Sequence, residues 1–244
     1  MKLPVFFQSK RGTEPTASLA ESCPQVFTEV LSDPFVRGFL HRPAKPNGSG
    51  VVLSHSAGSN CQSPLLIALA DVLCGAGYAV LRCDLPFRQD RPYGPPGPGD
   101  AKRDRAGLKN AVAALKNLGS GRIFLGGHSY GGRQASMLCA EQSENAPEFA
   151  AGLLLLSYPL HPPRKPEQMR TQHFFNLRTP ALFVQGTRDP FASIAEMEQA
   201  LKLIPAKTKL LTIEGAGHDL GFKGKRGKSE LSDTVLGNFR EFFS

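Results

Sequence analysis

One serine in this 244-residue chain lies in a sequence context that suits a catalytic nucleophile. Ser129 is the centre of a GxSxG pentapeptide, Gly127 to Gly131, with the apolar segment Ile123 to Leu125 before it and a helical pattern, Gly132 to Glu141, after it. A sharp turn from strand to helix holds such a serine in a strained backbone conformation with its hydroxyl exposed. The positions two before and two after must be nearly free of side chain, which explains the glycines. The pattern predicts that Ser129 is a nucleophile.

A serine hydroxyl needs a base to take its proton. With this motif the acid and then the histidine follow the serine along the chain, each on a loop after a later strand. His218 comes directly after the last predicted strand and is the predicted base. His173 lies in a long irregular segment and is interpreted as a surface residue or a substrate contact.

The base in turn needs an acid that orients its ring. Asp189 follows an apolar strand and precedes His218, as the order requires. Asp219 adjoins the histidine in sequence and would point elsewhere, and Asp84 precedes the serine and is expected to anchor the loop after its own strand. We therefore predict Asp189 as the acid.

A developing oxyanion needs two backbone N–H donors. The first is predicted to be the N–H of Tyr130, directly after the nucleophile, and the second to come from His55 to Gly58, directly after an early strand. Within that loop Ala57 is the preferred donor and Ser56 the alternative, while His55 and Ser56 are also candidate substrate contacts. The other interpretation of these four residues is a plain turn that ends the strand.

The elements that must position these residues alternate between short apolar runs and longer amphipathic stretches. Apolar runs of this kind are buried on both faces, and their alternation with helices predicts a parallel sheet wrapped by helices on both sides. The predicted strands are Val51–Leu53, Ala79–Leu81, Ile123–Leu125, Gly152–Leu156, Ala181–Val184 and Leu210–Ile213, and the predicted helices are Pro64–Cys74, Arg103–Leu118, Gly132–Glu141, Ile194–Ile204 and Leu231–Phe242. The fold class is α/β.

The beginning of the chain follows a different pattern. Residues 1–25 show no sustained period and are predicted to be an extension, whereas Val26–Leu31 and Val36–Arg42 suggest an antiparallel pair of strands. No internal repeat and no linker divides the rest. We therefore expect a single α/β domain over residues 26–244.

Composition excludes several classes of protein. Hydrophobic residues make up 41% and charged residues 20%, which is typical of a folded globular chain rather than a disordered one. The longest clean apolar run, Leu153 to Leu156, is far shorter than the roughly 20 residues of a membrane span. The five cysteines form no CxxC pair and lie near no histidine cluster, so we expect no metal ion and no cofactor. Reduced thiols and a start that is no secretory signal favour a cytoplasmic protein.

The net charge of +8 is concentrated in three segments predicted to follow strands. Pro86–Gly107, Pro159–Thr179 and Gly221–Ser229 together hold 13 Lys and Arg against 4 Asp and Glu. At the carboxyl ends of the strands they would surround the site and favour an anionic substrate, with Arg88 and Arg91 as candidate contacts. The alternative is that they are ordinary solvated loops. Pro159–Pro180 is too short for a helical cap domain, and the chain has no recognised nucleic-acid reader motif, so no nucleic-acid partner is expected.

The chain resembles a known superfamily. Gly127 to Gly131 with Asp189 and His218 resembles the α/β-hydrolases, and three longer stretches resemble the dienelactone-hydrolase-like family of bacterial hydrolases: Asp84–Gln89, Gly126–Arg133 and Leu182–Pro190. That family is grouped with a testis-expressed protein and a chromatin-complex subunit, the NSL regulatory subunit, of animals. The resemblance covers about residues 26–244 and implies the α/β-hydrolase fold without a large cap.

Two departures limit what the resemblance implies. Dienelactone hydrolases proper use a cysteine nucleophile where this chain has Ser129, so their substrate does not transfer. Related hydrolases have His-Gly in the oxyanion loop where this chain has His55-Ser56, and a positive φ at Ser56 would be strained.

The sequence therefore predicts a serine hydrolase that cleaves a carboxylic ester or thioester of a small, anionic molecule through an acyl-enzyme. The competing hypothesis is a catalytically silent α/β-hydrolase-like binding or scaffold protein, because a fold does not establish an activity. The sequence carries no signal for the oligomeric state.

Overall fold

The structure is a computed structural model that describes residues 25–29, 32–142, 149–222 and 228–244. The predicted extension over residues 1–25 lies outside this part of the chain, apart from Gln25, which begins the first strand. The boundary of the single domain therefore stays a prediction.

The described strands form one eight-stranded sheet in the order β1-β2-β4-β3-β5-β6-β7-β8. The pair β1–β2 and the pair β2–β4 are antiparallel, and β3 to β8 are parallel to one another. The predicted antiparallel pair at the start is confirmed. The strands are β1 (Gln25–Glu29), β2 (Val36–His41), β3 (Ser49–Ser54), β4 (Ala79–Cys83), β5 (Arg122–His128), β6 (Gly152–Leu156), β7 (Ala181–Gly186) and β8 (Thr208–Ile213).

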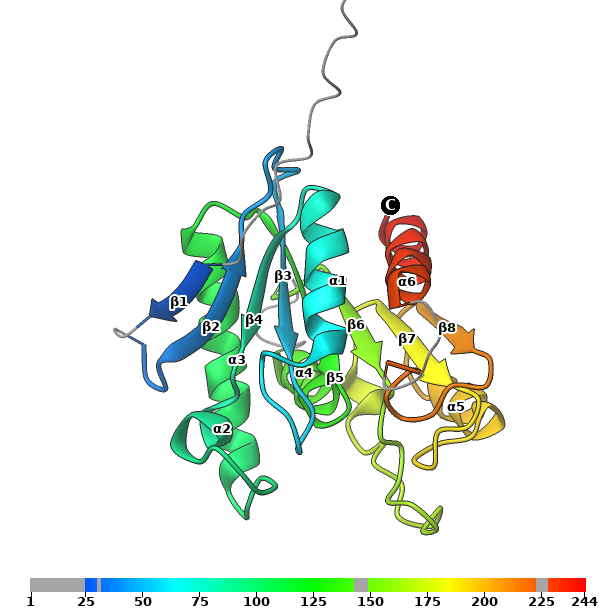
Figure 1. Cartoon of the computed structure of the whole chain (residues 1–244). Coiled ribbons are helices and arrows are strands. Elements are labelled where there is room, and N and C mark those ends of the chain that lie inside the picture. The colour runs from blue at the N-terminus through cyan, green and yellow to red at the C-terminus, as the bar shows by residue number, and fades with distance from the viewer. Residues whose placement is uncertain (1–24, 30–31, 143–148, 223–227) are drawn as a thin grey trace, which may run out of the picture.

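Helices cover both faces of the sheet, as Figure 1 shows. Residues of α1 and α6 share one core cluster with one face of the strands, and residues of α3, α4 and α5 share another with the opposite face. The helices are α1 (Pro64–Gly75), α2 (Pro86–Asp90), α3 (Asp100–Asn117), α4 (Tyr130–Gln142), the 3₁₀ turn η1 (Phe174–Asn176), α5 (Ile194–Leu201) and α6 (Lys228–Phe243). The predicted α/β-hydrolase fold is confirmed, because a mostly parallel open sheet lies between two helical layers.

Two helices, α2 and α3, differ from the prediction made from the sequence. No helix was predicted between the strand Ala79–Leu81 and Arg103, but the structure contains α2, which begins at Pro86, and α3 begins three residues earlier than predicted, at Asp100. The fixed φ of Pro86 suits the first position of a helix, and the side chain of Phe87 is buried. Tertiary packing therefore stabilises a short helix that the polar composition of the segment does not predict. Between residues 157 and 180 the structure shows one 3₁₀ turn and no helical cap.

No helix in the described ranges combines the length and apolar character that crossing a membrane would require.

Candidate active site

Ser129 lies at the junction of β5 and α4 with a φ of 53°. This left-handed conformation is rare for a serine and costs free energy, so the surrounding structure must hold it. The Ser129 N–H donates to the carbonyl of Leu156 at 2.8 Å. The flanking glycines are needed because a Cβ at Gly127 or Gly131 would lie 2.4 or 2.5 Å from the Oγ of Ser54. The turn therefore presents the serine at the carboxyl edge of the sheet.

We expect Gly131→Ala to destabilise the protein and Gly58→Ala to leave its stability nearly unchanged. A Cβ at position 131 would lie 2.6 Å from the carbonyl oxygen of His55, so the backbone of the loop must shift, at a cost of about 1–3 kcal/mol. At Gly58, in the same loop, an added Cβ meets no atom within 4 Å. Thermal unfolding of the two variants tests this, and equal melting temperatures would contradict it.

The structure brings the three predicted side chains together. His218 Nε2 lies 2.8 Å from Ser129 Oγ, and His218 Nδ1 lies 2.8 and 3.1 Å from the two carboxylate oxygens of Asp189. The Asp189 side chain is fully buried, and its Oδ1 also accepts the N–H of Phe191. A buried carboxylate that accepts Nδ1–H holds the ring so that Nε2 faces the hydroxyl. This arrangement can transfer a proton from Ser129.

The competing side chains lie elsewhere. Asp219 accepts the N–H of Gly221 through its own side chain. His173 is only half-buried, and its Nε2 lies 2.8 Å from the Oγ of Ser136, whereas the Oγ of Ser129 is paired with His218. His161, a third histidine after the serine, is buried with Nε2 3.4 Å from Glu196.

The loop after β3 lies against the first turn of α4. The N–H of Gly131 donates to the carbonyl of His55 at 3.1 Å, which places the predicted donors Tyr130 and Ala57 on neighbouring segments. Neither of these two N–H groups has an acceptor within the described ranges. Ser56 is not among the described residues with a positive φ. The backbone strain that a serine would suffer in place of the glycine of related hydrolases is therefore not present. The geometry is compatible with either Ala57 or Ser56 as the second donor.

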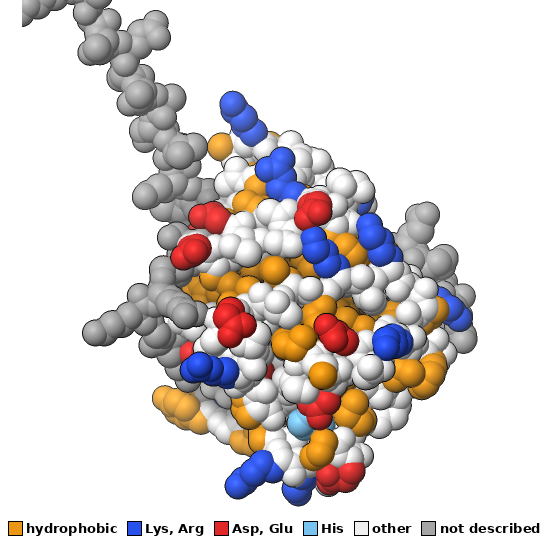
Figure 2. All heavy atoms as spheres, turned by 90° about the vertical axis from the view of Figure 1, so that its right-hand side faces the viewer, with side chains coloured by type: hydrophobic (Ala, Val, Ile, Leu, Met, Phe, Trp, Pro, Cys, Tyr) orange, Lys and Arg blue, Asp and Glu red, His pale blue; other side chains and the backbone are white. Residues whose placement is uncertain are grey.

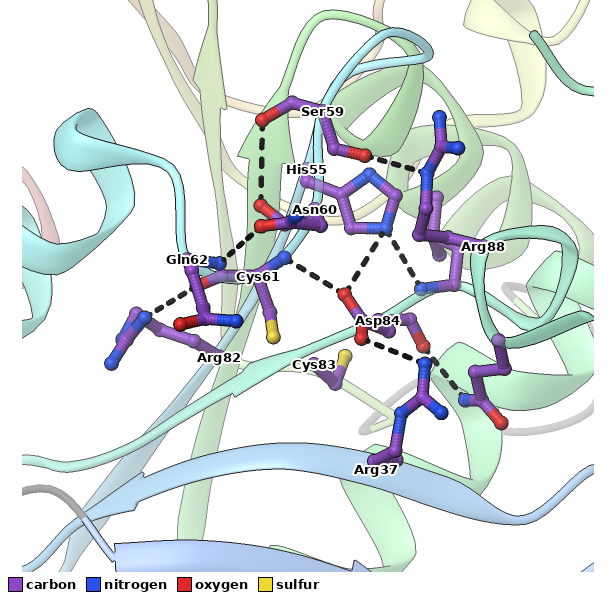
Figure 3. A network of polar contacts seen from close by, with 12 residues as sticks. Arg37, His55, Ser59, Asn60, Cys61, Gln62, Arg82, Cys83, Asp84 and Arg88 are labelled. Carbon is purple, nitrogen blue, oxygen red and sulfur yellow. Dashed lines mark hydrogen bonds and ion pairs between the residues drawn. The ribbon is translucent and has the colours of Figure 1, made fainter. Parts of the chain in front are cut away.

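The His55 side chain supports this loop from inside the protein. It is fully buried, its Nδ1 lies 2.8 Å from the carbonyl of Ser56, and its Nε2 accepts the N–H of Leu85 (Figure 3). Burial lowers the pKa of the His55 imidazole to about 4, so the ring is neutral at physiological pH. The prediction that His55 contacts substrate is therefore wrong, because a side chain without exposed surface cannot do so.

Asp84, directly after β4, anchors the same loop with its carboxylate, whereas the sequence predicted that it would anchor the loop after its own strand. Its Oδ1 accepts the N–H of Cys61 at 2.8 Å, and its Oδ2 pairs with Arg37 at 3.2 Å (Figure 3). The carboxylate thus connects the loop before α1 to β2 and β4.

Arg88 also holds the loop instead of contacting substrate. Only 5% of the residue is exposed, and its guanidinium donates to the carbonyls of Ala57, Ser59 and Gly94 at 2.8 to 2.9 Å. Figure 3 shows Arg88 reaching the backbone of Ser59. Because backbone carbonyls occupy its donors, the prediction that Arg88 binds substrate is corrected. A single sequence could not show this, because the carbonyls come from two different loops.

The predicted positive rim is weaker than the charge count suggests. Arg91, Arg103 and Arg105 each pair with a carboxylate, of Asp100, Asp90 and Glu141 respectively. The lysines and arginine of residues 223–227 lie outside the described residues. Figure 2, which views the edge that carries β8, shows acidic and basic side chains interspersed. Arg91 lies in an ion pair with Asp100, and its contact with a substrate stays a prediction.

Two supporting residues were missed by the sequence reasoning. His128, inside the pentapeptide, has Nε2 2.7 Å from the carbonyl of His218, and burial lowers its pKa to about 4. The neutral ring therefore donates to that carbonyl and supports the loop of the candidate base. Asp104 is buried and accepts both the Tyr130 hydroxyl at 2.7 Å and the Phe87 N–H at 3.0 Å. The sequence offers a signal for His128, which lies inside the pentapeptide, but none for Asp104.

The rings of Phe191, Phe174 and Phe175 lie in three different environments. The Phe191 ring lies 4.2 Å from the His218 ring, centroid to centroid, and so borders the site. Phe174 is fully buried in the core, and Phe175 is 59% exposed. Of the three, Phe191 is placed to contact a substrate.

A family model described as an alpha/beta hydrolase domain matches residues 47–240. Similar solved structures include a dienelactone hydrolase from Anabaena variabilis, at 22% identity and a TM-score of 0.69 over 90% of this chain and 98% of that one. A bacterial heroin esterase is 17% identical, with a TM-score of 0.69 over 94% of this chain and 87% of that one. An α/β serine hydrolase homologue from Coxiella burnetii is 16% identical, with a TM-score of 0.66 over 91% and 99%. At these identities the likeness concerns the fold alone.

Proposed function

This chain belongs to the α/β-hydrolase domain family, and from that premise we propose that it is a serine hydrolase that cleaves a carboxylic ester or thioester. The family and the esterases among the similar structures support hydrolase chemistry in general. The finer assignment rests on one observation, the continuous hydrogen-bonded row from Asp189 through His218 to Ser129. The predicted grouping with animal proteins and the predicted cytoplasmic location stay predictions.

The proposed reaction begins with attack of the Ser129 Oγ on the substrate carbonyl. His218 Nε2, at 2.8 Å, takes the hydroxyl proton, while Asp189 accepts the Nδ1–H and stabilises the imidazolium. The N–H groups of Tyr130 and Ala57 donate to the oxyanion of the tetrahedral intermediate. His218 then protonates the leaving alcohol or thiol. In the second half of the reaction His218 takes a proton from water, the resulting hydroxide attacks the acyl-enzyme, and His218 returns the proton to the Ser129 Oγ as the acid leaves.

Two local features favour this reaction over a plain glycine turn. The positive φ of Ser129 is a strained conformation, and strain of this kind persists where a site requires it. The loop that carries the second predicted N–H donor is held by three side chains, His55, Asp84 and Arg88. Preorganised donors of this kind are worth about 10²- to 10³-fold in rate each.

Covalent labelling with a fluorophosphonate tests the proposal. The reagent phosphonylates an activated serine, so we expect the wild-type protein to be labelled and Ser129→Ala to remain unlabelled. Heat-denatured wild-type protein serves as the control for non-specific reaction. An unlabelled wild-type protein would favour the catalytically silent scaffold, and labelling that survives the substitution would show that another residue is the nucleophile.

A further inference from the structure

Two arginines, Arg133 and Arg170, differ from the other half-buried arginines. Arg133 is on α4 one turn after the serine, and its N–H donates to the Ser129 carbonyl at 2.9 Å. Arg170 lies in the segment after β6, where its carbonyl accepts the Tyr158 hydroxyl at 3.0 Å and one of its guanidinium nitrogens, Nη1, donates to the carbonyl of Pro159 at 3.3 Å. Within the described ranges, neither guanidinium lies within ion-pair distance of a carboxylate, whereas Arg105, close by, pairs with Glu141.

The two guanidiniums are close enough to act on each other. Burial, followed by the charge of Arg133, lowers the pKa of Arg170, and burial with the same charge lowers the pKa of His173 to about 4. The Nε of Arg133 is buried and has no hydrogen-bond partner in the described part of the chain. A buried N–H donor without an acceptor costs free energy, and a second cation beside the same guanidinium adds electrostatic repulsion. An anion bound between them would offset both.

Further unpartnered polar atoms lie at the neighbouring strand ends. Ser157 follows β6 and Gln185 is the second-last residue of β7, and both are fully buried. The Oγ of Ser157 and both amide atoms of Gln185 have no partner among the described residues. The Ser157 N–H donates to the carbonyl of Val184 at 2.8 Å, and the Ser129 N–H donates to that of Leu156, so the backbone ends of β6 and β7 adjoin the turn that carries Ser129. Buried polar groups in native proteins are almost always hydrogen-bonded, so these strand ends hold unsatisfied polar atoms, but neither side chain has the exposed surface with which to contact a ligand directly.

We propose that Arg133 and Arg170 form a subsite that binds a carboxylate group of the substrate while its ester or thioester carbonyl lies at Ser129. This inference rests on the proposed hydrolase function and specifies its substrate class. Guanidinium groups match the two oxygens of a carboxylate through paired N–H donors. One helical turn, about 5.4 Å along the axis, separates Ser129 from Arg133. This distance suits a short dicarboxylic monoester, with its ester at Ser129 and its free carboxylate at Arg133.

Hydrolysis of monoethyl and diethyl glutarate compares a charged substrate with a neutral one on the same acyl chain. We expect the wild type to prefer the monoester, and Arg133→Gln to lower kcat/KM for the monoester at least about tenfold while changing that for the diester less than about twofold. Arg133→Lys keeps the charge and is expected to recover part of the preference. Lys116→Gln removes one exposed positive charge from the far end of α3 and controls for net charge. An equal loss on both esters would overturn the subsite.

Thermal unfolding in the presence of glutarate tests the subsite without catalysis. Glutarate, at constant ionic strength against chloride, should raise the melting temperature of the wild type and of Lys116→Gln, but not that of Arg133→Gln or Arg170→Gln. Stabilisation of the wild type without ester hydrolysis would leave the subsite standing and sink the hydrolase proposal. Hydrolysis with no glutarate effect would sink the subsite alone. Stronger stabilisation by phosphate than by glutarate would overturn the carboxylate assignment.

Discussion

Asp189→Asn is expected to lower kcat for ester hydrolysis by about 10³- to 10⁴-fold while leaving the fold intact. Asn has the shape of Asp, so the loop after β7 keeps its conformation. The effect comes from the proton on the His218 ring and not from a change in packing.

The hydrogen bonds around Asp189 determine which way the new amide points. Oδ1 accepts the N–H of Phe191 at 2.9 Å, so in the variant the amide oxygen stays there and the NH₂ group faces His218 Nδ1. An NH₂ donor requires Nδ1 to be the acceptor, which moves the ring proton to Nε2. Nε2, 2.8 Å from Ser129 Oγ, then has no lone pair to accept the serine proton.

Steady-state kinetics of wild type, Asp189→Asn and Asp219→Asn on one ester measure this effect. Asp219 is the matched control because it adjoins the histidine in sequence but accepts the N–H of Gly221. We expect its variant to stay within a few-fold of wild type, with similar melting temperatures for all three proteins. A comparable loss of kcat in both variants, or none in Asp189→Asn, would show that Asp189 does not orient the base.

The free energy of unfolding is expected to fall by several kcal/mol between pH 7 and pH 5. Burial lowers the pKa of four histidines, His41, His55, His128 and His173, to about 4 from an ordinary value of 6.5. Between these two values the unfolded chain binds more protons than the folded protein. Stability is therefore full above about pH 6.5 and is lost as the pH falls toward 4, by up to about 1.4 kcal/mol per pH unit for each histidine.

Hydrogen bonds give this pH dependence a structural cause at two of the four rings. Nε2 of His41 accepts from Arg82 at 2.9 Å, and Nε2 of His55 accepts from the N–H of Leu85 at 3.0 Å. Protonation would place two donors face to face in the interior.

Urea denaturation at pH 7.5, 6 and 5 measures the dependence. The variant His55→Gln, which removes one titrating ring, should show a shallower dependence by about one proton. A free energy of unfolding that stays constant over this range would contradict the expectation.

The sequence by itself determined the fold class, the strand–turn–helix around Ser129 and the chain order of the candidate triad. These features depend on local properties: the apolar period of each strand, and the two glycines that a close turn requires. Parallel topology then places the loops after successive strands on one edge, so Asp189 and His218 could be selected without knowledge of their contacts.

Only the tertiary structure decided what the arginines and the buried polar side chains do. Arg88 and Arg91 are both arginines in the segment after β4, where a substrate contact was expected. The structure shows that Arg88 donates to backbone carbonyls and that Arg91 pairs with Asp100. The residue type of Arg133 does not distinguish it from the other arginines of the sequence. That it has a second arginine and no carboxylate beside it depends on how α4 packs against the segment after β6. The physical reason is that a charged side chain acts according to its neighbours and its desolvation, which are set by segments far apart in the chain.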